Sequence, residues 1–326
     1  ASMTKPMTSV AIMMLHEEGR LLLGDPVSKF LPQMAAMKVA RSPDSTETVP
    51  ARREMTVQDL LRHTSGLTYD NRGTSAVHKA YPGSSVSAAV KLGRDEFLDT
   101  IGKVPLLYQP GTAWEYGFST DILGHIVEAV SGMSLGAFLK ARLWDPLGMV
   151  DTAFALSTSA EGRYARAFAK CPLTGDPQSV HHASGRPMQW ESGGGGAVST
   201  TADYLRFVQM LLAGGTLGGE RILGRKTVEL MRADHLGPDI DNRLTTMDPA
   251  FSGYGFGLGF AVRSAAGVSA AMGSAGDYYW SGVYGTYFWI DPAEDLAVVF
   301  MAAAPGQMRL RYRQLVRGLV LQALAD

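Results

Sequence analysis

The first 19 residues carry the feature that most constrains the fold, a helical pattern that is apolar on most of its sides. Residues 10–15 are an unbroken apolar run, and helical spacing continues on either side of it. Ser2 can cap the helix, Pro6 is tolerated in a first turn, and Gly19 can end it. A helix that is apolar around most of its circumference belongs in the core. The sequence therefore predicts a buried helix at the start of the chain.

The rest of the chain divides into a helical part and a later strand-rich part. Helical spacing of apolar residues recurs in four segments: 56–63, 119–132, 201–213 and 310–324. β-Branched and aromatic residues favour strands in three segments: 256–262, 283–290 and 296–301. Residues 291–295 predict a hairpin turn between the last two.

This order predicts an α+β protein with its sheet near the C-terminus. We assign residues 1–235 to a mainly helical lobe and residues 236–326 to the C-terminal part of an α/β lobe. In the last helix we expect Leu315, Leu319 and Val320 to face inward and the arginines to face outward.

Composition excludes several classes of function. Thirty basic and 31 acidic residues give a net charge of −1, too balanced for the basic field that binds nucleic acid. The apolar runs fall short of the roughly 20 residues that span a bilayer, so we expect no membrane partner. Cys171 is the single cysteine and cannot form an internal disulfide, which makes the cytoplasm the default expectation. A homo-oligomer stays possible.

Ser2 and Lys5 are the first candidates for chemistry. Their spacing of three residues places both side chains on one face of a helix, within reach of each other. Such a lysine can accept the hydroxyl proton or activate the serine electrostatically, provided that burial or nearby charge tunes it. The alternative is an N-cap serine beside a solvated lysine, because this short pattern is common by chance.

Four segments, in order and spacing, make the chain resemble the class C β-lactamases and their esterase relatives, the family VIII carboxylesterases. They are Ser2-Met-Thr-Lys5 with the sequence that follows to Pro32, and residues 56–67, 144–149 and 193–204. The resemblance implies the penicillin-recognising serine hydrolase fold, in which an antiparallel sheet flanked by helices joins a mostly helical lobe. It also implies that Ser2 is the nucleophile.

A second element of that family is a Tyr-x-Asn pattern before a helix, and here it is Tyr116-Gly117-Phe118. The resemblance makes Tyr116 a general base or proton relay. A phenol, with an ordinary pKa of about 10, can act so near neutral pH only beside a cation, for which Lys5 is the candidate. Phe118 replaces the asparagine that contacts the substrate's amide, which puts amide recognition in doubt. The alternative is that Tyr116 is only a core residue.

The family's third element, Lys-Thr-Gly, is replaced here by Trp280-Ser281-Gly282, as is typical of the esterase branch. The change removes the cation that pairs with a β-lactam carboxylate and predicts an apolar wall for a neutral group. By resemblance, the backbone N–H groups of Ser2 and Val283 form the oxyanion hole. Alternatively, Trp280 is only a strand aromatic.

Other candidate residues are weaker. Ser65 is more typical of a turn than of a nucleophile. His181 and His182 have no second pair of ligands at a useful spacing, and Cys171 lacks activating neighbours. We therefore expect no metal and no cofactor.

The sequence thus predicts a carboxylesterase that hydrolyses short-chain acyl esters through a Ser2 acyl-enzyme, with Lys5 and Tyr116 transferring protons. Three alternatives stay open: acyl transfer to an alcohol, β-lactamase or D-amino peptidase activity, and a binding protein that keeps the scaffold without catalysis. Since this family has strands before its serine helix and one residue precedes Ser2 here, we also expect that sheet strands are missing from this chain.

Overall fold

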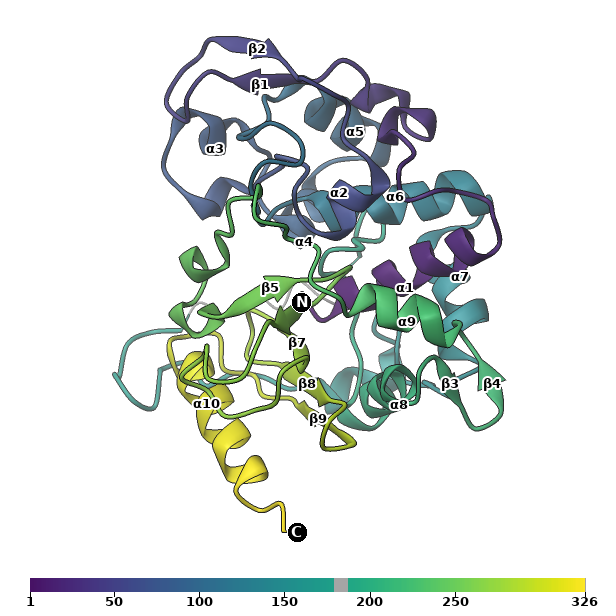
Figure 1. Ribbon diagram of the computed structural model, residues 1–326, viewed down its shortest axis with the longest axis vertical. Helices are drawn as coiled ribbons and strands as arrows, with labels where there is room; N and C mark the ends of the chain where they lie inside the picture. Colours follow the sequence, from purple (N-terminus) through teal and green to yellow (C-terminus); the bar gives the residue numbers. More distant parts are fainter. Residues whose placement is uncertain (179–186, 326) are drawn as a thin grey trace.

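The computed structural model describes residues 1–178 and 187–325. Figure 1 shows a helical upper part, a lower part built on a sheet, and α1 between them. The helices are α1 (Thr4–Glu17), α2 (Val57–Leu61), α3 (Ala76–Ala80), α4 (Ser85–Lys91), α5 (Arg94–Lys103), α6 (Ser119–Ser131), α7 (Leu135–Leu139), α8 (Thr201–Leu212), α9 (Arg225–Met231) and α10 (Met308–Leu321). The strands are β1 (Lys38–Ala40), β2 (Thr48–Pro50), β3 (Thr216–Leu217), β4 (Glu220–Arg221), β5 (Tyr254–Phe256), β6 (Ala261–Arg263), β7 (Tyr278–Ser281), β8 (Tyr287–Asp291) and β9 (Leu296–Phe300).

The main sheet is antiparallel, with the strands in the order β5-β6-β7-β8-β9. The predicted turn at residues 291–295 joins β8 to β9, and Asp291 pairs with Leu296 across it. Residues 256–262 are not one strand as predicted. A tight turn, in which the Gly257 N–H donates to the Phe260 carbonyl and Gly259 has a φ of +115°, divides them into β5 and β6. The predicted strand at 283–290 begins only at Tyr287, because the chain first turns after β7.

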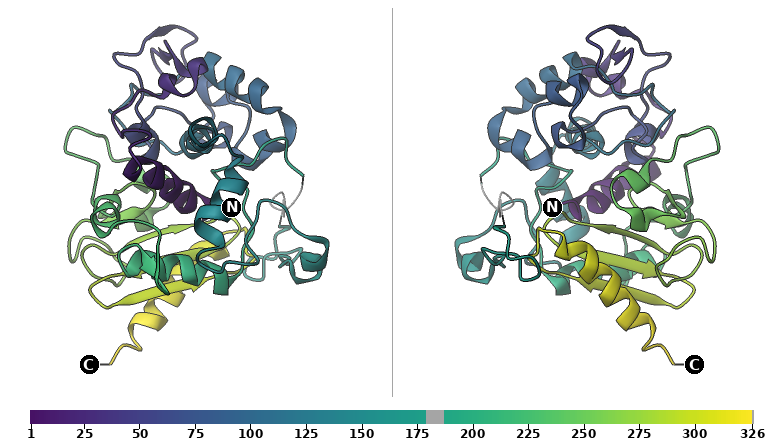
Figure 2. Two further views of the ribbon diagram at one scale, coloured as in Figure 1. Left: turned by 90° about the vertical axis from the view of Figure 1, so that its right-hand side faces the viewer. Right: turned by 90° about the vertical axis from the view of Figure 1, so that its left-hand side faces the viewer.

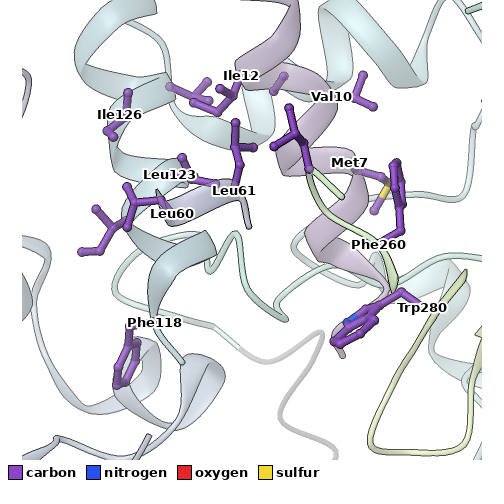
Figure 3. Packing of buried hydrophobic residues seen from close by; sticks show 14 of the residues in the cluster. Met7, Val10, Ile12, Leu60, Leu61, Phe118, Leu123, Ile126, Phe260 and Trp280 are labelled. Carbon is purple, nitrogen blue, oxygen red and sulfur yellow. The ribbon is translucent and has the colours of Figure 1, made fainter. Parts of the chain in front are cut away.

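Helix α1 is the centre of the core. Its residues from Thr4 to Leu15 are all buried, which confirms the predicted buried helix. Figure 3 shows its Met7, Val10 and Ile12 beside side chains of α2 and of α6 and beside Phe260 in the turn between β5 and β6. Ser2 is not the N-cap that we predicted: Met3 holds that position, and the Ser2 carbonyl accepts from the Lys5 N–H at 3.1 Å.

The sheet is covered by elements from both sides of the boundary predicted at residue 235. Helix α8 precedes that boundary and packs on β8 and β9. Helix α10 follows it and lies along the sheet, as Figure 2 shows for the yellow C-terminal helix. The lower part of the molecule therefore draws on residues from both predicted lobes. The antiparallel sheet with helices around it is the predicted α+β fold class.

The orientation predicted for α10 is wrong for Leu315 and Leu319, whereas Val320 is partly buried against the core as predicted. Leu315 and Leu319 are 47% and 60% exposed, whereas Arg317 is only 3% exposed. The reason is an ion pair: the Arg317 guanidinium donates to Asp277 Oδ2 at 2.5 Å, and Arg263 donates to the same oxygen at 2.7 Å. Two arginines on one carboxylate hold α10 against β6 and β7, and helical periodicity alone does not reveal such a partner.

Within the described ranges no single helix is long and apolar enough to cross a membrane. Two consecutive helical segments, Ser119–Ser131 and Leu135–Trp144, together have the length and apolar composition of a membrane-spanning segment. They are bent by 77° relative to each other.

The buried cluster makes a testable prediction for stability. Asp277→Asn leaves two buried guanidinium groups without a charge partner, so we expect it to lower the free energy of unfolding by about 3–5 kcal/mol. Urea unfolding followed by circular dichroism measures this change. Asp145→Asn is the control, because it breaks only the exposed pair with Lys140 and should cost less than about 1 kcal/mol. Equal effects of the two substitutions would contradict the role given to Asp277.

Candidate active site

Lys5 lies in the first turn of α1 and is only 2% exposed. Its ammonium donates to the Gly194 carbonyl at 2.7 Å and to the Tyr69 hydroxyl at 3.2 Å. Nζ also lies 4.6 Å from the centre of the Tyr116 ring, a cation–π contact. The interpretation of Lys5 as a solvated lysine is therefore wrong.

Tyr116 precedes α6 and is almost wholly buried. Its ring centre lies 5.4 Å from that of Trp280 on β7 and 4.9 Å from that of His63. The aromatic neighbours fix the ring on one side, and Lys5 approaches it with its charge. The start of α1, the segment before α6 and the end of β7 thus meet at one place.

Ser2 lies immediately before α1, half-buried, one turn away from Lys5. The turn after β7 lies against Ala1, the residue that precedes Ser2. A Cβ built on Gly282 would lie 3.2 Å from the Ala1 Cβ and would collide with the Thr286 hydroxyl, so a side chain there would force Thr286 to move. This contact brings the turn after β7 beside the residue that precedes the nucleophile candidate. Val283 itself is 52% exposed.

Phe118 and Trp280 take positions different from those that we expected. Phe118 is 0% exposed and packs against the rings of Tyr69 and Phe97 in the upper core. Figure 3 shows it apart from Trp280, at the opposite side of the view. Trp280 is 1% exposed and packs behind Tyr116. Neither ring forms an open wall of the site, because both are buried in the packing that supports the site.

Sequence reasoning missed a buried polar network centred on Asp121. Its carboxylate accepts from Ser85 Oγ at 2.6 Å, from Ser192 Oγ at 2.6 Å and from the Gly194 N–H at 3.0 Å. Ser85 in turn shares a hydrogen bond of 2.5 Å with the Tyr69 hydroxyl. Asp121 thus supports both groups that accept from Lys5. One signal was available: a carboxylate among the apolar residues at the start of a buried helix.

The glycine-rich segment at residues 193–196 lies along α1. The Thr8 hydroxyl donates to the Gly193 carbonyl at 2.9 Å, and the Ala197 N–H donates to Thr4 Oγ1 at 3.1 Å. A Cβ on Gly194 would collide with Ser85 and Asp121. Glycine there permits the close approach that gives Lys5 its carbonyl partner.

The Lys5 charge is maintained by its neighbours. Burial alone lowers the pKa of the ammonium, but the Tyr116 and Tyr69 phenols and the Asp121 carboxylate raise the pKa above the ordinary lysine value. Lys5 is therefore a cation at neutral pH.

A cavity of about 400 Å³ lies on another face of α1. Met3, Met7 and Tyr204 contribute to its wall, whereas Ser2, Lys5 and Tyr116 do not. Met3 and Met7 are one turn apart on a face roughly opposite Lys5, and Ala1 and Thr286 also line the cavity, so it extends to the turn after β7 and not to the Lys5–Tyr116 pair.

Two of the weaker candidates lie within the described residues. Ser65 is buried and its hydroxyl is hydrogen-bonded to Ser119 at 2.8 Å. Cys171 is a buried free thiol. No group of three or more metal-ligating side chains occurs in residues 1–178 and 187–325. His181 and His182 lie outside the described residues.

Comparisons with known proteins agree with this geometry. A family model described as beta-lactamase matches residues 1–321. Protein Rv1367c of Mycobacterium tuberculosis is 36% identical over 92% of this chain and 76% of its own length. Esterase EstB of Burkholderia gladioli is 30% identical, again over 92% of this chain and 76% of its own length.

The solved structure of EstCE1, described as a hydrolase with promiscuous acyltransferase activity, is similar in fold. It superposes with a TM-score of 0.76 at 26% identity and covers 98% of this chain and 83% of the EstCE1 chain. The matching family model, the esterase relatives and the shared fold establish that the chain belongs to the beta-lactamase family of serine hydrolases.

Proposed function

We propose that the chain is a carboxylesterase of the family VIII type, which hydrolyses short-chain acyl esters through an acyl-enzyme on Ser2. The observation that carries the proposal is the buried Lys5 ammonium over the Tyr116 ring, one helical turn from Ser2. The names of two relatives support it, since EstB is an esterase and EstCE1 a hydrolase.

Acylation follows from this arrangement. Ser2 Oγ attacks the ester carbonyl carbon while its proton passes to the Tyr116 phenolate, whose charge the Lys5 ammonium stabilises. The carbonyl oxygen becomes an oxyanion, held by the N–H groups of Ser2 and Val283. The bond to the alcohol oxygen then breaks, and the leaving alkoxide takes the proton back from Tyr116.

Deacylation repeats these steps with water. Tyr116 accepts a proton from a water molecule that attacks the acyl carbon, and a second oxyanion forms at the same two N–H groups. Collapse releases the carboxylic acid and returns the proton to Ser2. Because Lys5 keeps its proton in both halves, its role is electrostatic, and Tyr116 is the proton carrier.

The surroundings favour a neutral substrate. Trp280 stands where the β-lactamases carry a lysine, and no charged group of β7 replaces it, since Tyr278, Tyr279, Trp280 and Ser281 are uncharged at neutral pH. The exposed Val283 side chain, in the turn after β7, offers an apolar contact to a substrate. A short acyl chain gains about 25 cal/mol for each Å² that it buries there.

The second candidate function is acyl transfer to an alcohol, as the description of EstCE1 suggests. It uses the same acyl-enzyme and differs only in the acceptor. An added alcohol that diverts the acyl group into a new ester distinguishes transfer from hydrolysis.

The nucleophile assignment predicts that Ser2→Ala lowers ester turnover by several orders of magnitude without unfolding the protein. Hydrolysis of p-nitrophenyl butyrate and the thermal melting temperature measure the two effects. Ser65→Ala is the matched control, since it removes a buried hydroxyl outside the site. An organophosphonate should label Ser2, and labelling of another serine with Ser2→Ala still active would overturn the assignment.

The coupling of Lys5 to Tyr116 predicts non-additive losses. We expect Lys5→Ala and Tyr116→Phe each to lower the acylation rate by about 10²–10⁴-fold, because each removes part of one proton-transfer unit. The double variant should then be little worse than either single variant. Pre-steady-state burst kinetics measure acylation, with exposed Lys38→Ala as the control. Fully additive losses would show that the two residues act independently.

The replacement of the family's lysine by Trp280 predicts selectivity for esters. A β-lactam carboxylate loses a charge-assisted hydrogen bond of about 1.5–3 kcal/mol, which is roughly 10- to 150-fold in kcat/KM. We therefore expect p-nitrophenyl butyrate to have a much higher kcat/KM than a chromogenic cephalosporin under the same conditions. Equal or faster cephalosporin turnover would place the chain with the β-lactamases.

A further inference from the structure

Arg313 on α10 reaches the turn that follows β7. Its Nη2 donates to the Gly282 carbonyl at 2.5 Å and, more weakly, to the Thr286 carbonyl at 3.4 Å. Its Nε is buried without a hydrogen-bond partner among the described residues. Across that same part of the chain, no carboxylate lies within 4.0 Å of the guanidinium, in contrast to the ion-paired Arg263 and Arg317.

A half-buried cation without a counter-ion costs free energy, so its position requires a reason. Burial and then the nearby charge of Arg309 lower the pKa of Arg313 to about 10, which leaves it charged at neutral pH. Its charge therefore acts on the two carbonyls that it contacts. Burying the arginine for stability alone would favour a carboxylate partner, as the neighbouring Arg317 has.

The turn after β7 shows which peptide group receives this charge. The Gly285 N–H donates to the Gly282 carbonyl at 3.0 Å, which makes residues 282–285 a β-turn with Val283 at its second position. The i→i+3 hydrogen bond of such a turn does not use the N–H of that position. The Gly282 carbonyl and the Val283 N–H belong to one peptide group, and the carbonyl accepts from both Gly285 and Arg313.

We propose that Arg313 is a positioning residue for the oxyanion hole. Its guanidinium polarises the Gly282–Val283 peptide from the carbonyl end and so strengthens the Val283 N–H as a hydrogen-bond donor. Hydrogen bonds in a chain polarise one another, and a charged donor at one end increases the effect. The inference rests on the proposed function, in which Val283 binds the oxyanion. It adds a cation that acts through the backbone and does not touch the substrate.

This role predicts a specific kinetic pattern. The oxyanion exists only in the tetrahedral states, so loss of Arg313 should lower kcat and leave KM nearly unchanged. Losing a whole oxyanion donor costs about 10²–10³-fold, and we expect Arg313→Met, which only weakens one donor, to cost about 10-fold. Arg313→Lys keeps a cation and should recover most of that loss.

Arg309→Met is the matched control, because Arg309 lies one turn earlier on α10 and donates to the Pro305 and Gly306 carbonyls at the start of its own helix. It should leave kcat unchanged, and melting temperatures check that all three variants are folded. If Arg309→Met loses as much kcat as Arg313→Met, or if Arg313→Met keeps the wild-type kcat, the proposal is overturned. Failure of the proposed function is distinct, since wild type would then lack Ser2-dependent esterase activity.

A spectroscopic measurement tests the same proposal without turnover. With ¹⁵N-valine labelling, the Val283 amide nitrogen resonance reports the hydrogen bonding of the preceding Gly282 carbonyl. We expect it to move in Arg313→Met, to move less in Arg313→Lys and to stay in place in Arg309→Met. An unmoved Val283 resonance in Arg313→Met would show that the guanidinium does not polarise this peptide.

Discussion

The site depends on the burial of one positive charge, the Lys5 ammonium. A charge that is 2% exposed is costly unless several partners surround it. Here a carbonyl of the glycine-rich segment, a hydroxyl from the loop between α2 and α3 and a ring from the segment before α6 converge on it. These segments are far apart in sequence. Because the buried Lys5 ammonium must be surrounded by polar partners, its contacts fix the relative positions of these segments.

Asp121 makes that convergence possible at a second level. It makes no hydrogen bond to Lys5. It accepts hydrogen bonds from Ser85, which is itself bonded to Tyr69, and from the Gly194 N–H, and the Gly194 carbonyl accepts from Lys5. The Tyr69 and Ser85 hydroxyls each have a hydrogen-bond partner on both sides, which is the condition under which a buried polar network stabilises one arrangement. Ser2 then needs no strong side-chain contact of its own, because the start of α1 positions it.

The sequence allowed prediction of those parts that depend on local patterns. Helix α1, the helix at 119–132 and the β8–β9 hairpin follow from periodicity, helix-ending glycines and turn residues. The Ser2–Lys5 spacing selected Lys5 and the family resemblance selected Tyr116, and the structure brings these two side chains together. The parts that could not be predicted depend on distant partners. Phe118 points into the upper core because the rings of Tyr69 and Phe97 pack against it there, and no local sequence pattern encodes this packing.

The two arginines of α10 show why periodicity failed on this helix and why the difference matters. Arg317 and Arg313 are one turn apart, both withdrawn from solvent, and an apolar-face rule would place both outside. Arg317 meets Asp277 and its charge is neutralised within the sheet, so it attaches the helix. Among the described residues Arg313 donates to backbone carbonyls and has no carboxylate partner, and the turn that it contacts lies against Ala1, just before α1. Because Arg317 attaches the helix, Arg313 can keep its positive charge without a counter-ion at the edge of the site. There the charge can stabilise an oxyanion, and a carboxylate partner would neutralise this effect.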